Sequence, residues 1–503
     1  MPPIPQAPIT KQDGNTGAVT PATTGILAII AFSLAGVANV AQSYGRYTDI
    51  QQTNGLGPQV DFAAYFMNTA KKPVVVVTPT CTTAGVYGSI TKTGTGTSTP
   101  TAGGTAPCDD FQVQVKFPAG GTIGVTGITY QYSLDGGNNW SGILALGTAT
   151  TITLLAPPLP GLSTGVSFTL GAGTIVANDS FTCVTTRPQM QNSDLVTALE
   201  ALRTTKLPWD NVLIDVDASS TMVATVDSWL SGLNALGVYK FAWMNTRKKN
   251  RPVPATETDA TYQTAMSTLL ATTSTINVDV GTDGGDLPSP VTGLVIPRPT
   301  SLAVATRKMQ YGLGVDPAFV GNGPIPGFQI RDSSGNLKWH DEDPASGNPG
   351  LDAQRLSTLR SIPGKQGVYV TNAHILSASG SDYIWDQHAV CMNAACNLAY
   401  QLLTDILSKG VNKNPPDPTT NKIYILEADA KSIEDHINPQ LQAALNKQVV
   451  AVQFNLSRTD DLSSNSSSSV TAELQIVALA YIKNVATTAK FVKSITVSTA
   501  GNG

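Results

Sequence analysis

Charge is what this sequence has least of. Charged residues make up only 13 % of the chain, against about 25 % in ordinary soluble domains. The net charge is −4, and the longest basic run is "TRKKNR" at residues 246–251. Nucleic-acid-binding proteins carry a basic patch that neutralises phosphates, so no nucleic-acid partner is expected. A weakly charged surface suits a protein that stacks against copies of itself.

Cysteine is also scarce. The five cysteines are Cys81, Cys108, Cys183, Cys391 and Cys396. Their odd number and the lack of a CxxC pair exclude a dense disulfide framework and the usual zinc spacings. A disulfide between Cys81 and Cys108, or between either one and Cys183, is the alternative to free thiols. Cys391 and Cys396 lie in a predicted core helix and are expected to be inert. No metal or other cofactor is predicted.

A basic leader is missing before the most apolar early segment, "GILAIIAFSLAGVANVA" at residues 25–41. The preceding residues are rich in proline and hold one lysine, which Asp13 offsets. A signal peptide needs a basic start, and a membrane span needs about 20 apolar residues. The segment is therefore predicted to be a buried strand with its following turn, and no membrane insertion is expected.

The N-terminal part of the chain reads as an arm followed by a β–α–β unit. Residues 1–24 have many breakers and no apolar period, which indicates an extended arm. A strand near residues 26–31, a helix over 59–70 and a strand over 73–77 then alternate. Residues 25–90 are the first part of an α/β core.

A change of composition marks an insertion. The Thr/Gly-rich residues 90–107 resemble a flexible linker. Short alternating strands follow without helices, and Asp-Gly-Gly in "SLDGGNNWSG" is a hairpin signal. This pattern predicts an inserted small β-sandwich domain over residues 108–187.

The α/β pattern resumes over residues 188–385. Strands alternate with helices, which predicts a mainly parallel sheet with both faces covered. Residues 314–364 are rich in Gly, Pro, Asp and Asn, so an irregular surface excursion is expected there.

Residues 386–503 form the last predicted unit. Its elements are a long helix over 386–410, a strand over 422–428, a helix after Pro439, a strand over 449–456, and a closing hairpin of two strands, 474–482 and 491–497. On the last strand Phe491, Ile495 and Val497 share one face.

The sharpest enzymatic pattern is "NVLIDVDAS", an apolar strand that ends in Asp215, Asp217 and Ser219. It resembles the first motif of haloacid-dehalogenase-like phosphotransferases, in which Asp215 would be the nucleophile and Asp217 the acid/base, with "VGTDGGD" at residues 280–286 as the metal loop. The alternative interpretation is structural: an aspartate caps the next helix. Residues 161–165 match a nucleophile elbow but lack the helix after it. The sequence shows no set of residues that would together form a catalytic site. No catalytic residue is therefore assigned, and no enzyme is expected.

The layout of the chain resembles the tail sheath proteins of contractile bacteriophage tails and related injection systems. The opening unit at residues 25–77 and the long helix "IWDQHAVCMNAACNLAYQLLTDILSKG" carry the likeness, together with the terminal strands. The resemblance implies a sheath-like α/β core with extended N- and C-terminal strand arms. It also implies a virion protein, assembled in the host cytoplasm, that polymerises around a tail tube and contracts to drive the tube through the host envelope.

The resemblance further implies the partners and the assembly residues. The partners are copies of the chain in hexameric rings stacked helically, a tail tube protein, and baseplate and tail terminator proteins. The assembly strands would include Ile4, Ile9, Phe491, Val492, Ile495 and Val497, which add to sheets of neighbouring subunits by β-augmentation. A secreted or cell-surface adhesin bearing the β-sandwich is the alternative.

Overall fold

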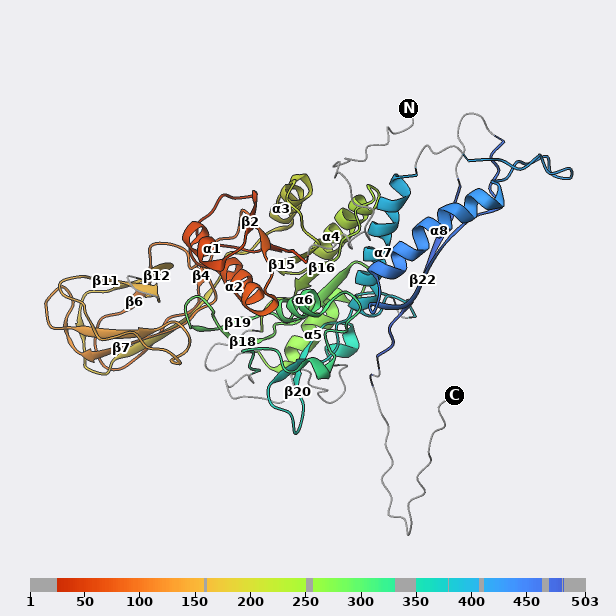
Figure 1. The fold of residues 1–503 in the computed structure, drawn as a ribbon. Helices are drawn as coiled ribbons and strands as arrows, with labels where there is room; N and C mark the ends of the chain where they lie inside the picture. The colour runs from red at the N-terminus through yellow and green to blue at the C-terminus, as the bar shows by residue number, and fades with distance from the viewer. Residues whose placement is uncertain are drawn as a thin grey trace, which may run out of the picture.

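The computed structural model describes residues 25–157, 161–249, 257–330, 350–378, 380–406, 411–463, 470–481 and 483. The predicted N-terminal arm and the predicted strand at 491–497 lie outside these residues. Figure 1 shows three parts in a row: a β-rich part at one end, an α/β part in the middle, and an end that carries helix α8 and strand β22.

The middle part is built on one six-stranded sheet. In spatial order its strands are β17 (Val278–Gly281), β16 (Ala242–Asn245), β15 (Asn211–Asp217), β1 (Leu27–Ile30), β3 (Val74–Val77) and β2 (Ala41–Tyr44). All pairings are parallel except that of β2 with β3. The predicted mainly parallel sheet is confirmed. The chain crosses from β3 to β15 past β1, so the strand order reverses between β1 and β15, as in doubly wound α/β sheets.

Helices cover both faces of this sheet. Alternate strand residues point to opposite faces, so the two faces hold separate apolar clusters. One face packs against α2 (Pro58–Ala70) and α6 (Thr300–Tyr311); the other packs against α3 (Asn192–Thr204), α4 (Ser220–Asn234) and α5 (Asp259–Leu270). Burial on both sides explains the uninterrupted apolar runs of β1, β3 and β15. Helix α1 (Tyr47–Asn54) contacts α2.

Two sheets of short strands make up the β-rich part. The first contains, in order, β10 (Leu144–Ala145), β9 (Thr129–Ser133), β7 (Gln112–Ala119), β14 (Ser180–Thr186) and β4 (Val86–Tyr87), with β5 (Thr91–Thr93) also on β14. The second contains β11 (Thr151–Ala156), β12 (Leu162–Leu170) and β6 (Pro100–Gly103). Strands β8 (Gly121–Thr122) and β13 (Thr174–Ile175) pair with each other. Both sheets contribute to one apolar cluster, in which Phe168 and Phe181 meet edge to face at 4.9 Å.

The prediction of a flexible linker over residues 90–107 is wrong. Strand β5 pairs with β14, and β6 pairs with β12, so this tract belongs to the β-rich part. Threonine suits strands, and here the ladder bonds outweigh the flexibility that glycine adds. The chain enters and leaves the β-rich part at neighbouring positions, because Thr83 and Gln189 form an antiparallel bridge. Its first strand therefore precedes the predicted boundary at residue 108.

Smaller elements connect the middle part to the C-terminal part. The antiparallel pairs are β18 (Gly285–Pro288) with β19 (Val295–Arg298) and β20 (Leu359–Ser361) with β21 (Val368–Val370), and the short helices are η1 (Val320–Asn322) and η2 (Asp352–Gln354).

The C-terminal part packs two helices against a two-stranded sheet. Helices α7 (Asp386–Thr404) and α8 (Glu427–Ala444) share an apolar cluster with β22 (Val449–Leu456) and β23 (Ala472–Ala478). The predicted strand over 422–428 is wrong, since those residues form one isolated bridge and α8 begins at Glu427. The predicted helix after Pro439 is too short, because Pro439 lies inside α8. Apolar packing of Ile433, Ile437 and Leu441 against the cluster offsets the one backbone hydrogen bond that proline removes.

The first strand of the predicted closing hairpin is present as β23, and its predicted partner at 491–497 lies outside the described residues. Strand β23 pairs antiparallel with β22, with Phe454 opposite Leu474. Helix α7 also ends at Thr404, earlier than predicted.

Candidate functional site

Asp215 and Asp217 lie at the carboxyl end of β15, beside the point where the strand order reverses. In open α/β sheets, ligands bind in the crevice at this point. The two residues are two apart in a strand, so their side chains leave the same face. Their position is therefore the first place to look for chemistry.

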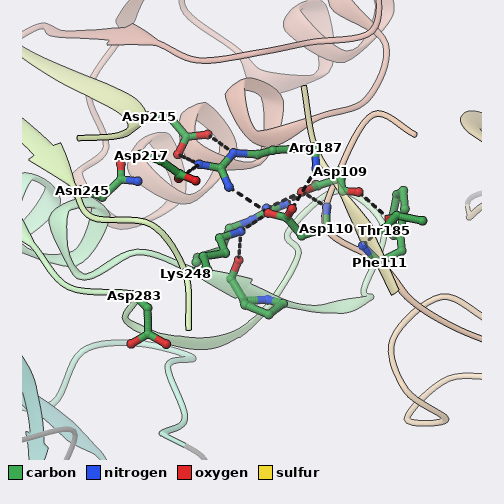
Figure 2. Close-up of polar contacts among 12 residues, drawn as sticks. Asp109, Asp110, Phe111, Thr185, Arg187, Asp215, Asp217, Asn245, Lys248 and Asp283 are labelled. Atoms are coloured by element: carbon green, nitrogen blue, oxygen red, sulfur yellow. Dashed lines mark hydrogen bonds and ion pairs between the residues drawn. The ribbon is translucent and has the colours of Figure 1, made fainter. Parts of the chain in front are cut away.

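Arg187 fills this position. Its Nε and Nη2 donate to both carboxylate oxygens of Asp215 at 3.0 and 2.9 Å, and Nη2 also donates to Asp217 at 3.2 Å (Figure 2). Its Nη1 donates to Asp110 at 3.0 Å. The side chains of Arg187 and Asp215 are only 3 % and 2 % exposed. A guanidinium that binds one carboxylate through two parallel hydrogen bonds forms a strong and directional pair.

The charges around Arg187 stabilise one another. Burial alone disfavours a charged guanidinium, but the nearby carboxylates of Asp215 and Asp110 hold the pKa of Arg187 well above its usual range. Burial likewise acts against ionised Asp110, but Lys248 and Arg187 outweigh it and lower the pKa of Asp110. Lys248 donates to Asp110 and, at 2.9 Å, to the carbonyl oxygen of Pro297. Arg187 and Asp110 are therefore charged at neutral pH.

A second buried arginine repeats the arrangement. Arg298, in β19, donates to both oxygens of Asp109 at 2.8 and 2.6 Å. It also binds Asp61 of α2, whose other oxygen accepts a hydrogen bond from Ser289 at 2.6 Å. Burial opposes the charge of Arg298, but Asp109 and Asp61 raise its pKa. Asp109 and Asp110 thus join the β-rich part to two separate elements of the α/β part.

This arrangement argues against the phosphotransferase interpretation. An aspartate nucleophile needs a free carboxylate oxygen to attack phosphorus, whereas both oxygens of Asp215 accept hydrogen bonds from Arg187. The helix-cap interpretation of the aspartates is also wrong, because Ser219 caps α4 by accepting a hydrogen bond from the N–H of Met222 at 3.2 Å. Figure 2 shows Asp283 of the proposed metal loop apart from Asp215 and Asp217. In the described ranges, no three His, Cys, Asp or Glu residues are grouped so that they could hold a metal ion.

The other sequence candidates are dispersed. Residues 162–170 form strand β12, so the elbow pattern at 161–165 is part of a sheet. Cys81, Cys108 and Cys183, like Cys391 and Cys396, are free thiols in the structure. No helix among the described residues is long and apolar enough to cross a membrane.

A different kind of site is the sheet edge in the C-terminal part. Strand β22 presents Val452, Phe454 and Leu456 to the core, and the facing residues of β23 are Ile476, Leu474 and Ala472. The outer face of the sheet carries exposed Val450 and Val477, 65 % and 55 % accessible. Figure 1 shows β22 and α8 together at the end of the molecule remote from the β-rich part.

One edge of this sheet is covered by α8, and the other is open within the part of the chain that the structure describes. Asn438 of α8 donates to the carbonyl of Phe454 at 2.9 Å and accepts from its N–H at 2.7 Å, and Glu434 accepts from the N–H of Leu456 at 2.8 Å. The backbone groups of Phe454 and Leu456 therefore point away from β23. In an antiparallel ladder, the residues opposite them must also point away. The N–H and C=O groups of Ala472, Leu474 and Ile476 consequently face outward along β23, where no strand of the described part pairs with them.

Sequence reasoning found the strand that forms this edge and the two aspartates, but missed both arginines. Arg187 is 28 residues from Asp215, and Arg298 is 189 residues from Asp109. No local spacing connects such pairs. The only signal was the rarity of charge, which makes each arginine next to an apolar strand a candidate for burial.

The comparisons with known proteins give a family and several similar folds. The family model described as DUF2586, N-terminal domain, matches residues 4–284, more than half of the chain. A search of curated protein sequences found no match.

Among solved structures, a sheath tail protein from Listeria innocua is 13 % identical with a TM-score of 0.42, over 91 % of this chain and 96 % of that one. A sheath tail protein from Desulfitobacterium hafniense is 10 % identical with a TM-score of 0.43, over 94 % and 100 %. A chain of the anti-feeding prophage baseplate is 9 % identical with a TM-score of 0.47, over 98 % and 100 %. The similar structures thus come from sheath tail proteins and a baseplate, the kind of assembly that the sequence resembles.

Proposed function

The chain belongs to the DUF2586 family, whose description states no function, and we propose from its own residues that it is a structural subunit of a contractile tail sheath. The subunits polymerise into a helical sheath around a tail tube, and contraction of the sheath drives the tube through the host envelope. The protein acts as a virion component and not as an enzyme.

The observation that carries this proposal is the open edge of β23. A seven-residue strand with outward N–H and C=O groups is a template for a strand from another chain. Proteins usually protect such an edge, and this chain does protect the opposite edge through Asn438 and Glu434. Leaving only one edge open gives the contact a direction. A head-to-tail contact that does not close on itself produces a helical assembly.

The arms supply the partner strand in this proposal. Phe491, Ile495 and Val497 near the end of the chain lie outside the described residues and would share one face of a strand. Ile4 and Ile9, in the proline-rich start of the chain, also lie outside them. A strand from one subunit that adds to β23 of the next links the two chains through the main chain. Such links hold subunits together while they rotate and slide past one another.

The buried ion pairs suit the same role. Arg187 and Arg298 fix the β-rich part to the α/β part through charges that are shielded from solvent. A subunit that transmits force must move as a rigid body, and hydrogen-bonded buried charges resist separation because each would be left unpaired. The stored work would come from subunit contacts that are better buried in the contracted state.

The partners follow from this role. They are copies of the chain in stacked hexameric rings, a tail tube protein, and baseplate and terminator proteins at the two ends of the sheath. Assembly takes place in the host cytoplasm.

Electron microscopy of Leu474→Pro tests the proposal. Proline removes the outward N–H of Leu474 and blocks strand addition at the edge. The wild type should form rings or tubes, alone or with the co-expressed tube protein, and Leu474→Pro should remain monomeric.

Leu474→Ala is the matched control. It removes most of the same side chain but keeps the N–H, so it should still assemble. Tubes formed by the proline variant, or a wild type that stays monomeric in the presence of the tube protein, would contradict the proposal.

A further inference from the structure

The outer face of the first sheet of the β-rich part is hollowed and polar. A cavity of about 480 Å³ is lined by β7, β9, β14 and Trp140. Strand register places Gln131, Lys116 and Ser180 side by side across three strands, with Gln114 and Thr182 beside them. The alternate residues of β7, Val113, Val115 and Phe117, are buried in the core. Small-ligand sites in proteins have volumes of about 300–1,000 Å³ and a few convergent polar groups.

Trp140 stands at the rim of this hollow. It is 37 % exposed and lies on the loop between β9 and β10. Its indole N–H has no hydrogen-bond partner in the part of the chain that the structure describes. An exposed aromatic ring over polar side chains offers one ligand both an apolar surface and hydrogen bonds.

The loop that carries Trp140 is held in place before any ligand arrives. Asp135 accepts hydrogen bonds from Ser133 and from the backbone and side chain of Asn139, at 2.6–2.8 Å. Asp135 also accepts from the N–H of Val295 at 3.1 Å, which ties the loop to β19. Gly136 and Gly137 adopt φ angles of 72° and 96°, which side chains rarely allow. A site that is ordered in advance loses less entropy on binding.

The polar side chains in the hollow are held in position and keep hydrogen-bonding groups for a ligand. The amide nitrogens of Gln114 and Gln131 donate to the carbonyl oxygens of Gly136 and Ser141 at 3.0 and 3.2 Å. These bonds orient the side-chain oxygens of both glutamines as acceptors for hydroxyl donors. Ser180, Thr182 and Asn178 add groups that can donate or accept.

Lys116 adds a charge that no acidic side chain of the described residues neutralises. Its Nζ lies 3.8 Å from the centre of the Trp140 ring, and no acidic side chain of the described residues pairs with it. A cation held over an aromatic ring in a polar hollow attracts a negatively charged group.

We propose that this hollow is a saccharide-binding site that prefers an acidic sugar. A carboxylate or sulfate on the sugar draws Lys116 off the Trp140 ring and pairs with it. The C–H face of the sugar then packs on Trp140, and its hydroxyls bond to Gln114, Gln131 and Ser180. This site is independent of assembly and gives the β-rich part of the chain a binding role of its own.

A glycan array tests the proposal. The intact wild-type protein is applied to an array of acidic and neutral bacterial surface polysaccharides, and hits are titrated by calorimetry. We expect saturable binding to acidic glycans. Trp140→Ala should weaken it at least tenfold, and Trp140→Phe, which keeps an aromatic face, should weaken it much less. Lys116→Gln should remove the preference for acidic over neutral sugars.

Two controls make the result decisive. Val125→Ala, at a residue of the β-rich part that is 54 % exposed and outside the hollow, should bind like the wild type. Near-ultraviolet circular dichroism should show that each variant is folded. An array without saturable hits, binding that survives Trp140→Ala, or equal competition by inorganic sulfate alone would overturn the proposal.

Discussion

Arg187 and Asp215 form a two-fold hydrogen-bonded ion pair across the junction between the β-rich part and the central sheet. Arg187 follows directly after β14, the last strand of the β-rich part, and Asp215 lies in β15. The pair therefore occupies the crevice in which other α/β proteins hold a ligand, and uses it to attach one part of the chain to another.

Replacing Arg187 should destabilise the protein strongly. Arg187→Ala leaves Asp215 buried with a charge and no partner, so we expect the free energy of unfolding to fall by about 3–5 kcal/mol. Urea unfolding followed by circular dichroism measures the change. Arg203→Ala removes an arginine from an exposed pair with Glu200 and should leave the curve unchanged. Equal effects of the two substitutions would contradict a structural role for the buried pair.

The boundaries of the β-rich part can be tested by excision. Removing residues 84–188, with Asp215→Asn to avoid an unpaired charge, should leave a folded α/β part, because Thr83 and Gln189 are already neighbours. Removing only residues 108–187 should give insoluble protein, since β5 and β6 lose their partner strands. Solubility and far-ultraviolet circular dichroism distinguish the outcomes. A folded product from the shorter excision alone would restore the boundary at residue 108.

Removing the arms should block assembly without unfolding the chain. We expect a protein that lacks residues 1–22, or everything after Lys490, to keep the thermal unfolding midpoint of the wild type and to fail to form tubes. Calorimetry and electron microscopy measure the two properties. Full-length tubes from both truncations would show that the arms are not the linking strands.

The stability of the protein should depend on pH through a buried acidic pair. Burial raises the pKa of Asp386 to about 6, against the attraction of Lys308. Burial and the charge of Asp386 raise the pKa of Asp279 well above its usual range, although a hydrogen bond from Ser357 opposes this. The folded protein therefore holds protons that the unfolded chain releases. The stability that this pair contributes is present at low pH and is lost as pH rises through about 6, and each proton that only the folded state retains accounts for a loss of about 1.4 kcal/mol per pH unit.

Asp279→Asn separates this effect from other titrations. Asparagine keeps the size of the side chain and an acceptor for Ser357, but it has no proton to release. The variant should lose less unfolding free energy than the wild type between pH 5 and pH 8 in urea titrations. Asp382→Asn, at a residue outside this pair, should follow the wild type. Parallel curves for Asp279→Asn and the wild type would rule out the linkage.

The thiols should react slowly in the folded protein. Burial raises the pKa of Cys81 to about 12 and that of Cys183 and Cys391 to about 11, so little reactive thiolate exists at pH 8. A colorimetric thiol reagent should titrate all five cysteines only after denaturation. Fewer than five, with altered mobility on a non-reducing gel, would reveal the alternative disulfide among Cys81, Cys108 and Cys183.

Local periodicity was enough to predict the buried strands of the α/β part and the helices that cover them, but not β2 or α1. The apolar composition of β1, β3 and β15 indicates that these strands are buried, because a strand covered on both faces must be apolar throughout. The helix around Asp386 was predicted for the same reason, from its apolar stripe. The resemblance to sheath proteins also depended on the order of such elements along the chain.

Only the tertiary structure determined which strands and which side chains pair with one another. The Thr/Gly-rich tract became strands because β12 and β14 offered it ladders, and α8 continued through Pro439 because an apolar cluster covered it. Arg187 and Asp215 meet across 28 residues, and among the described strands β23 pairs with β22 alone. A sequence pattern records whether a residue prefers to be buried or to be in a strand, but the free energy of pairing depends on which distant group lies within hydrogen-bond distance, and only the folded chain specifies that.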